Sequence, residues 1–158
     1  MKNTMVAYFS ATGVTRKVAE RLAELADADL YEIEPVIPYT AADLNWNDKN
    51  SRSSKEENDP SMRPEIRPLD VQINDYTTIY LGFPIWWGVA PRVVNTFLES
   101  FKFEGDTIIP FATSGGSDLG DAAKQLQAAS DPYADWKEGA ILNHPTDEQL
   151  KEFIDANK

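Results

Sequence analysis

Apolar runs and segments with helical spacing alternate along the chain. Runs at 5–9, 77–84 and 107–114 have the length and the β-branched and aromatic content of buried strands. Residues 29–35 alternate polar and apolar side chains, which predicts a half-exposed strand at or near a sheet edge. A short last strand is predicted within 138–144. Strands that alternate with helices are typical of βαβ units, so the pattern predicts an α/β fold with a parallel sheet.

The helical segments carry their apolar residues on one face. Val18, Leu22 and Leu25 recur at spacings of four and three, which predicts an amphipathic helix over 15–28. Further helices are predicted over 91–101 with Pro91 in the first turn, over 121–130, and from Thr146, where Thr146 and Gln149 match a capping box.

Residues 35–75 interrupt this alternation. They hold five prolines and a charged middle rich in serine and asparagine, with a short helix predicted around 53–58. A connection this long inside a compact domain is usually a functional loop or disordered. Its carboxylates Glu56, Glu57 and Asp59 are interpreted as a solvated charge run rather than a metal cluster. We therefore predict a single domain over 1–158 with a long insertion-like connection at about 35–75.

The loop after the first strand, residues 10–15, contains three hydroxyl side chains and a glycine. In an open parallel sheet, ligands bind beyond the carboxyl ends of the strands. Gly13 lets backbone N–H groups converge on an anion, and Ser10, Thr12 and Thr15 add donors where a helix begins. The loop lacks the signatures of nucleoside-triphosphate and dinucleotide sites. It predicts binding of a terminal phosphate by neutral donors, or alternatively a plain turn with Thr15 as helix cap.

The second loop, residues 84–91, contains adjacent tryptophans with no local partner. Trp86 and Trp87 would stack on a flat heteroaromatic ligand, and Gly88 would allow its close approach. The alternative is that both rings pack on the core or on a protein partner.

The third loop, residues 113–120, combines two glycines with three hydroxyl residues, and Asp118 is a candidate helix cap. Taken alone it could be an ordinary turn. A phosphate-binding loop, an aromatic loop and a donor-rich loop at one sheet edge together predict a phosphorylated planar cofactor.

Composition and charge narrow the choice of partners. Hydrophobic residues at 42% and charged residues at 26% over 158 residues are typical of one globular domain. No apolar run has the length of a signal peptide core or a membrane span, so we expect a cytoplasmic protein. The net charge of −11 makes nucleic acid and membrane surfaces poor partners. It leaves a basic protein partner, or a role in solubility alone.

Two residue types restrict the chemistry. The chain has no cysteine, which excludes disulfides, thiolate nucleophiles and cysteine-ligated metals. Its only histidine, His144, is interpreted as an incidental surface residue rather than a proton carrier. No catalytic side chain and no metal ligand are therefore predicted.

The chain resembles the flavodoxin family, specifically short flavodoxin-like proteins with a Trp-Trp loop. The resemblance rests on residues 10–15, on "YLGFPIWWGVAPRVVNTFLES" and "IIPFATSGGSDLG", and extends to the insertion "YTAADLNWNDKNSRSSKEENDPSMRPEI". It implies a three-layer sandwich with a five-stranded parallel sheet in the order 2-1-3-4-5. It also implies one non-covalent FMN.

The resemblance assigns cofactor contacts to the three loops. Residues implied to hold the FMN phosphate are Ser10, Ala11, Thr12, Gly13, Val14 and Thr15. Residues implied to line the flavin ring are Pro84, Ile85, Trp86, Trp87, Gly88, Thr113, Ser114, Gly115, Gly116 and Ser117. The chain departs from the family pattern at Val14, where asparagine is usual, and at Asp118, where glycine is frequent.

Two functions follow from the resemblance. The first is an electron-transfer protein that shuttles electrons between a reductase and an acceptor, with a basic redox protein as partner. The alternative is an NAD(P)H-dependent FMN oxidoreductase that acts on quinone-like small molecules. In that case Tyr39 and Trp46 of the long connection would fold over the flavin.

Overall fold

A parallel sheet forms the centre of the molecule. The computed structural model describes residues 3–45, 47–59, 61–68, 73–86, 89–114, 119–130 and 134–157. Its strands are β1 (Thr4–Tyr8), β2 (Asp29–Glu32), β3 (Thr78–Pro84), β4 (Thr107–Thr113), β5 (Asp135–Trp136) and β6 (Ala140–Ile141). The strand order is β2-β1-β3-β4-β5, with β6 also paired to β4, and every pairing is parallel. The predicted order 2-1-3-4-5 is confirmed, and the half-polar β2 lies at the edge.

The last strand position differs from the prediction of one strand within 138–144. Its two short segments, β5 and β6, shift register against β4 by one residue. Lys137 N–H donates to Ile108 O at 2.9 Å and Leu142 N–H to Ala112 O at 2.7 Å. Every second residue of a strand points its backbone N–H and C=O groups to the same neighbouring strand. Like Ile108 and Ala112, Pro110 therefore points toward β5 and β6, but proline has no N–H to donate. The missing donor explains why the edge strand bulges here.

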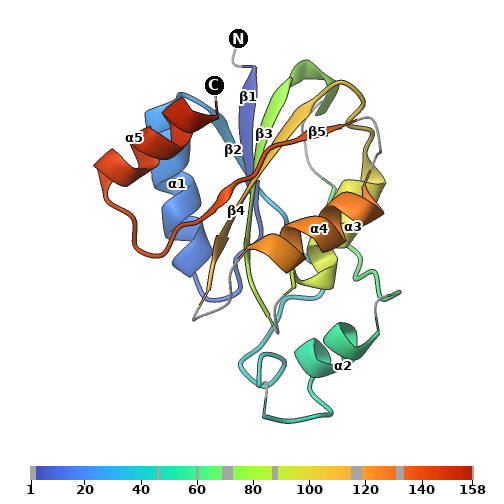
Figure 1. The fold of residues 1–158 in the computed structure, drawn as a ribbon. Coiled ribbons are helices and arrows are strands. Elements are labelled where there is room, and N and C mark those ends of the chain that lie inside the picture. Colours follow the sequence, from blue (N-terminus) through green and yellow to red (C-terminus); the bar gives the residue numbers. More distant parts are fainter. Residues whose placement is uncertain are drawn as a thin grey trace.

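Helices cover both faces of the sheet. They are α1 (Val14–Ala26), α2 (Arg52–Asn58), α3 (Arg92–Ser100), α4 (Gly120–Ala129) and α5 (Asp147–Ala156), with a 3₁₀ turn at Ile73–Asp75. Helices α1 and α5 lie against one face, and α3 and α4 against the other (Figure 1). The arrangement is the three-layer sandwich that was predicted.

Alternation along the strands divides the core into two halves. In β1, Met5 and Ala7 pack with the residues of α3 and α4, whereas Val6 and Tyr8 pack with α1 and α5. All four side chains are at most 4% exposed. A strand buried on both faces reads as a continuous apolar run, which is why β1 could be predicted.

Two helix starts differ from the prediction and one agrees with it. Helix α1 takes Gly13 as N-cap with φ 93°, so the alternative in which Thr15 caps it is wrong. Pro91 is the N-cap of α3 rather than a first-turn residue. Helix α5 has the predicted capping box: Thr146 accepts from Gln149 N–H, and the Gln149 side chain accepts from Thr146 N–H.

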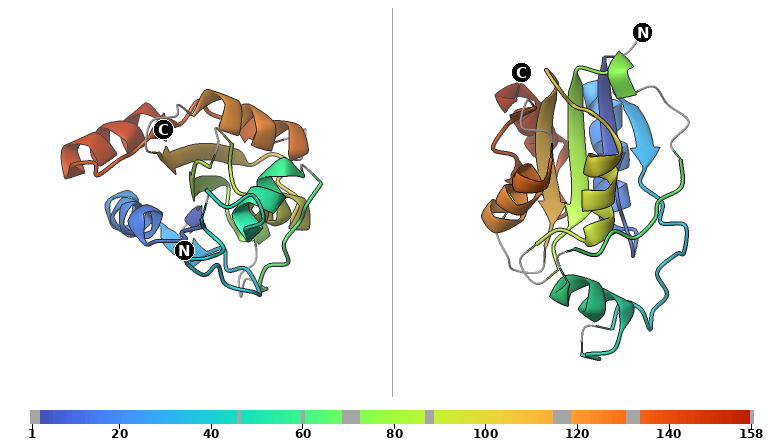
Figure 2. Two further views of the ribbon diagram at one scale, coloured as in Figure 1. Left: turned by 90° about the horizontal axis from the view of Figure 1, so that it is seen from below. Right: turned by 90° about the vertical axis from the view of Figure 1, so that its right-hand side faces the viewer.

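The long connection folds into a defined structure beyond the carboxyl ends of the strands. Its two ends pair antiparallel, since Val36 N–H donates to Glu65 O at 2.8 Å and Arg67 N–H to Glu34 O at 2.7 Å. The predicted short helix is confirmed as α2, which lies below the sheet in Figure 1 and in the right-hand view of Figure 2. The guanidinium of Arg92, on α3, donates to the carbonyls of Glu56 and Glu57 and so fixes the end of α2.

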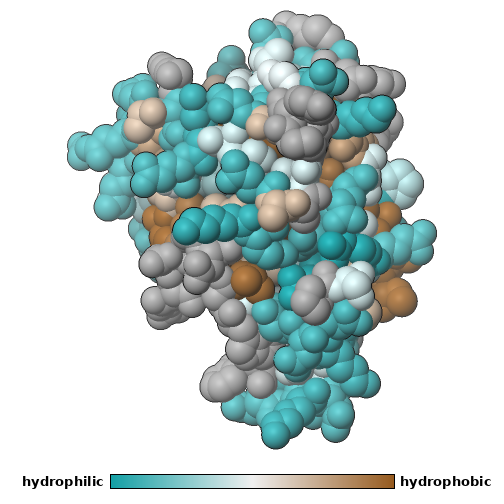
Figure 3. Space-filling view, turned by 45° about the vertical axis from the view of Figure 1, so that its right-hand side comes forward, coloured by the Kyte–Doolittle hydropathy of each residue, from teal (hydrophilic) through white to brown (hydrophobic). Residues whose placement is uncertain are grey.

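The face of the molecule drawn in Figure 3 is mainly polar. Among its coloured residues hydrophilic ones dominate, including those of the lobe that contains α2. Among the helices in the described ranges, none has both the length and the apolar character needed to cross a bilayer.

Candidate functional site: a cavity at the carboxyl ends of the strands

A cavity of about 450 Å³ opens where β1, β3 and β4 end. Ligand pockets usually have volumes of about 300–1,000 Å³. Its lining residues are Ala11, Thr12, Val14, Thr15, Leu44, Ser53, Pro84, Ile85, Trp86 and Thr113. The three loops singled out from the sequence therefore all contribute to one site, together with two residues of the long connection.

The first loop presents part of its hydroxyl set to the cavity. Thr12 and Thr15 line it, and α1 begins beside them, so first-turn N–H groups without intrahelical acceptors lie at this end. Ser10 lies outside the lining and instead accepts a hydrogen bond from Gly13 N–H at 3.0 Å, which shapes the turn. Arg16 is held by a two-pronged contact to Glu32 at 2.8 and 2.9 Å. Hydroxyl and N–H donors, rather than a cation, therefore face the cavity here.

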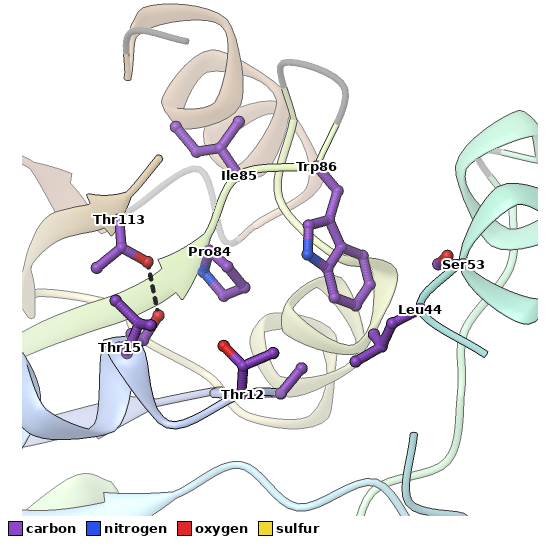
Figure 4. Close-up of a pocket in the computed structure, with 10 residues that line it drawn as sticks. Thr12, Thr15, Leu44, Ser53, Pro84, Ile85, Trp86 and Thr113 are labelled. Carbon is purple, nitrogen blue, oxygen red and sulfur yellow. Dashed lines mark hydrogen bonds between the residues drawn. The ribbon is translucent and has the colours of Figure 1, made fainter. Parts of the chain in front are cut away.

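Thr15 joins the first loop to the third. Its Oγ1 lies 2.8 Å from Oγ1 of Thr113 at the end of β4 (Figure 4), and the two residues are 2% and 5% exposed. Each hydroxyl has one proton, and their mutual bond uses one of the two. The pair therefore keeps one O–H that can be donated to a ligand.

Trp86 forms the aromatic wall. Its ring packs edge-to-face on Phe9 and Tyr39, with centroid distances of 5.9 and 5.5 Å. Its backbone closes a tight turn with Val89 through N–H···O bonds of 2.9 and 3.2 Å in the two directions. Trp86 thus has a fixed position between the core and the cavity, beside Pro84 and Ile85 (Figure 4).

Several predicted contacts lie outside the described residues. They are Trp46, Trp87, Gly88, Gly115, Gly116 and Ser117. Asp118, the candidate cap of α4, lies outside the described residues too, and the N-cap of α4 is Leu119. Ser114 is described, and Asn143 holds it on both sides: Ser114 N–H donates to Asn143 Oδ1 at 2.8 Å, and Asn143 Nδ2 donates to Ser114 O at 2.7 Å. Sequence reasoning missed Asn143, because nothing local marks an asparagine as the partner of a residue 29 positions earlier.

Leu44 and Ser53 were also missed. Both belong to the long connection and line the cavity at the opposite end from Thr15 and Thr113 (Figure 4). Their only sequence signal was the unusual length of that connection, which indicated a function without indicating which residues carry it.

Part of the predicted solvated charge run is buried. Glu56 is only 3% exposed, so its assignment to a solvated run is wrong, whereas Asp59 is exposed as expected. The Glu56 carboxylate accepts from Tyr39 Oη at 2.5 Å and from Arg52 Nε at 2.8 Å. Arg52 also stacks on the Tyr39 ring at 3.9 Å. A buried carboxylate needs such partners, and Tyr39 and Arg52 lie at positions that only the folded chain brings together.

Burial and the Glu56 carboxylate both raise the pKa of Tyr39 above its ordinary value. Tyr39 is therefore a neutral hydrogen-bond donor at physiological pH. Its ring contacts Trp86, so the buried Glu56 is linked through Tyr39 to the aromatic wall.

His144 is exposed, as predicted, although it borders a smaller cavity beside Gly13 and Lys17. No cluster of three or more potential metal ligands occurs in the part of the chain that the structure describes.

The lining chemistry fits a phosphorylated planar molecule. Hydroxyl groups and a helix N-terminus lie at one end, and an indole with apolar neighbours lies at the other. No Lys or Arg is among the described lining residues, so an anionic group would be held by neutral donors and by the helix dipole.

Comparisons with known proteins find flavodoxins and flavoproteins, which agrees with a site for a phosphorylated planar molecule. A flavodoxin family model matches residues 3–157. A solved structure from Bacteroides eggerthii, described as a candidate flavoprotein, has 47% identity and a TM-score of 0.93, covering 98% of this chain and 97% of that chain. A second, from Bacteroides uniformis and described likewise, has 50% identity and a TM-score of 0.92, covering 97% of each chain.

A more distant structure is a flavoprotein from Lactobacillus acidophilus in complex with FMN. It has 23% identity and a TM-score of 0.75, covering 97% of this chain and 99% of that chain, so the likeness concerns the fold. No curated protein matches the chain. The family match spans nearly the whole sequence and the predicted strand order is present, so the chain belongs to the flavodoxin family.

Proposed function

We propose that this protein binds FMN in the cavity at the carboxyl ends of β1, β3 and β4 and serves as an electron-transfer protein. The observation that supports it most is the composition of that cavity. Threonine hydroxyls at the start of α1 line one end and Trp86 lines the other. FMN supplies the redox chemistry when bound, and the protein supplies orientation and electrostatics.

The phosphate would be held at the first loop. Thr12 and the first-turn N–H groups of α1 donate to it, and the remaining O–H of the Thr15–Thr113 pair is available nearby. Val14 replaces the asparagine of the family pattern, but its backbone N–H remains in the first turn of the helix. The ring would lie against Trp86, whose position is fixed by Phe9 and Tyr39.

The charge of the chain supports a role as a carrier. A net charge of −11 attracts a basic redox protein and increases the rate of productive encounters. The proposed partner is therefore a protein with a basic surface.

One observation favours a second candidate, an NAD(P)H-dependent FMN oxidoreductase that acts on quinone-like small molecules. Leu44 and Ser53 of the long connection close part of the cavity wall and could also line a pocket for a small substrate.

Titration of the apoprotein with FMN and with riboflavin tests the binding proposal. Riboflavin has the same ring but lacks the phosphate. We expect FMN to bind more tightly than riboflavin, and Thr12→Ala to weaken FMN by about threefold to tenfold while leaving riboflavin unchanged. Failure of wild-type protein to bind FMN contradicts the proposal.

Reduction kinetics separate the two candidates. A carrier loaded with FMN is reduced by NADPH only when a separate reductase is added. An oxidoreductase is reduced by NADPH alone and turns over 1,4-naphthoquinone.

A further inference from the structure

The hydroxyl of Ser53 has no hydrogen-bond partner although it is buried. Ser53 is 2% exposed and lines the cavity. In the described part of the chain, the buried side-chain atoms without a partner are Ser53 Oγ and Gln125 Oε1. The Gln125 amide nitrogen bonds to Asn95, between α3 and α4, so Gln125 has a structural partner. Ser53 is the one of the two that lies on the cavity.

The neighbouring serines have structural roles that Ser53 does not share. Ser51 Oγ accepts from Ser54 N–H and donates to Ser54 Oγ at 2.9 Å, which caps α2. The backbone N–H of Ser53 donates to Asp43 O at 2.9 Å. The hydroxyls of Ser51 and Ser54 and the backbone N–H of Ser53 therefore all have partners within the long connection, whereas the Ser53 hydroxyl has none. Buried hydroxyls in native proteins are normally hydrogen-bonded, so an unpartnered one on a residue that lines a cavity points to a ligand contact.

We propose that Ser53 is a cofactor-binding residue that donates a hydrogen bond to an acceptor on the edge of the flavin ring. The inference rests on the proposed function. Ser53 and Leu44 lie at one end of the cavity, and Thr15 and Thr113 lie at the other (Figure 4). A ring against Trp86 carries carbonyl oxygens and ring nitrogens as acceptors, and a change of the Ser53 χ1 rotamer would bring its hydroxyl to them.

The donor is held in place before the ligand arrives. Arg92 fixes the carboxyl end of α2, and the Arg52–Glu56 pair with Tyr39 ties the helix to the aromatic wall. A donor on a fixed helix loses little conformational freedom on binding, so its hydrogen bond adds to affinity. The long connection would thereby supply a polar contact to the ring.

Ser53→Ala tests the proposal because it should weaken flavin binding without lowering the stability of the apoprotein. Removal of an unpartnered hydroxyl should leave the urea midpoint of the apoprotein unchanged or raised. The Kd of FMN and the Kd of riboflavin should both rise by the same factor, about threefold to tenfold, because the lost contact is to the shared ring. Ser54→Ala is the matched control: it removes a hydroxyl that has a partner, so it should lower the midpoint and leave both Kd values unchanged.

Four outcomes would overturn the assignment. If the wild type binds FMN tightly and Ser53→Ala has the same Kd values, Ser53 makes no contact with the flavin, but the proposed function stands. A lowered urea midpoint in Ser53→Ala shows that the hydroxyl has a structural partner. If Ser53→Ala keeps its affinity for both flavins but the FMN-loaded variant has a raised KM for 1,4-naphthoquinone, Ser53 contacts a substrate and not the flavin. Absence of FMN binding by the wild type overturns both proposals.

Discussion

Thr15 and Thr113 are separated by 98 positions, yet their hydroxyl oxygens lie 2.8 Å apart inside the protein. The bond joins the start of α1 to the end of β4, and both residues line the cavity. It therefore couples two of the three loops that the sequence indicated separately.

Replacing either threonine by valine should lower stability, because the other hydroxyl is then buried without a partner. We expect Thr15→Val and Thr113→Val each to cost about 1–2 kcal/mol in the free energy of unfolding. The double variant should cost clearly less than the two single costs added together, since it removes both polar groups. Urea denaturation of the four proteins measures this coupling. Additive costs would mean that the hydroxyls do not depend on each other.

Asn143→Ala should weaken FMN binding without a large loss of stability. Asn143 does not line the cavity but holds both backbone groups of Ser114, where the third loop begins. Loss of these bonds should raise the Kd of FMN by about threefold, the effect of one typical hydrogen bond. Asn157→Ala is the control, because that side chain bonds to a backbone carbonyl on α5. Equal affinity in the two variants would rule out this role for Asn143.

Gly139→Ala should be far more damaging than Gly105→Ala. Both glycines have positive φ, 76° and 80°, which costs about 1–2 kcal/mol for a residue with a Cβ. A Cβ at Gly139 would also lie 2.0 Å from Pro110 O, whereas one at Gly105 meets nothing within 4 Å. We expect a loss of more than about 3 kcal/mol for Gly139→Ala. Thermal unfolding of both variants gives the comparison, and similar losses would contradict the close approach to Pro110.

The contribution of Glu57 to the free energy of unfolding should fall as pH rises from about 4.5 to 7. Burial raises the pKa of the Glu57 carboxyl from 4.5 to about 7, and the guanidinium of Arg92 offsets this in part. Between these values the folded protein holds a proton that the unfolded chain has released, so the stabilising contribution is lost as pH rises through 7.

Glu57→Gln cannot titrate, so its free energy of unfolding should decrease less than that of the wild type over this range. Urea denaturation at several pH values measures the difference. Glu65→Gln, at an exposed glutamate, should follow the wild type. Parallel curves for wild type and Glu57→Gln from pH 4 to pH 8 would contradict the assignment.

The sequence by itself determined most of the strands, the position of each helix to within a residue or two, and the family. Met5 to Phe9 form an apolar run because β1 is buried on both faces, and Thr146 with Gln149 predicts a cap because the partners are three residues apart. Such features depend on neighbours along the chain, so local patterns contain them. A proline such as Pro110 inside a strand indicates a missing backbone donor. Its consequence, the bulge between β5 and β6, depends on which strand lies beside it.

Only the tertiary structure decided which polar groups meet and which are buried. Glu56 looks like a surface charge in the sequence, yet Tyr39 and Arg52 enclose it. Ser51 and Ser54 bond to each other through their hydroxyls, whereas the buried hydroxyl of Ser53 has no partner, and the sequence does not distinguish the three serines. The physical reason is that burial and pairing depend on contacts between residues far apart in the chain, which hydrophobic periodicity does not record.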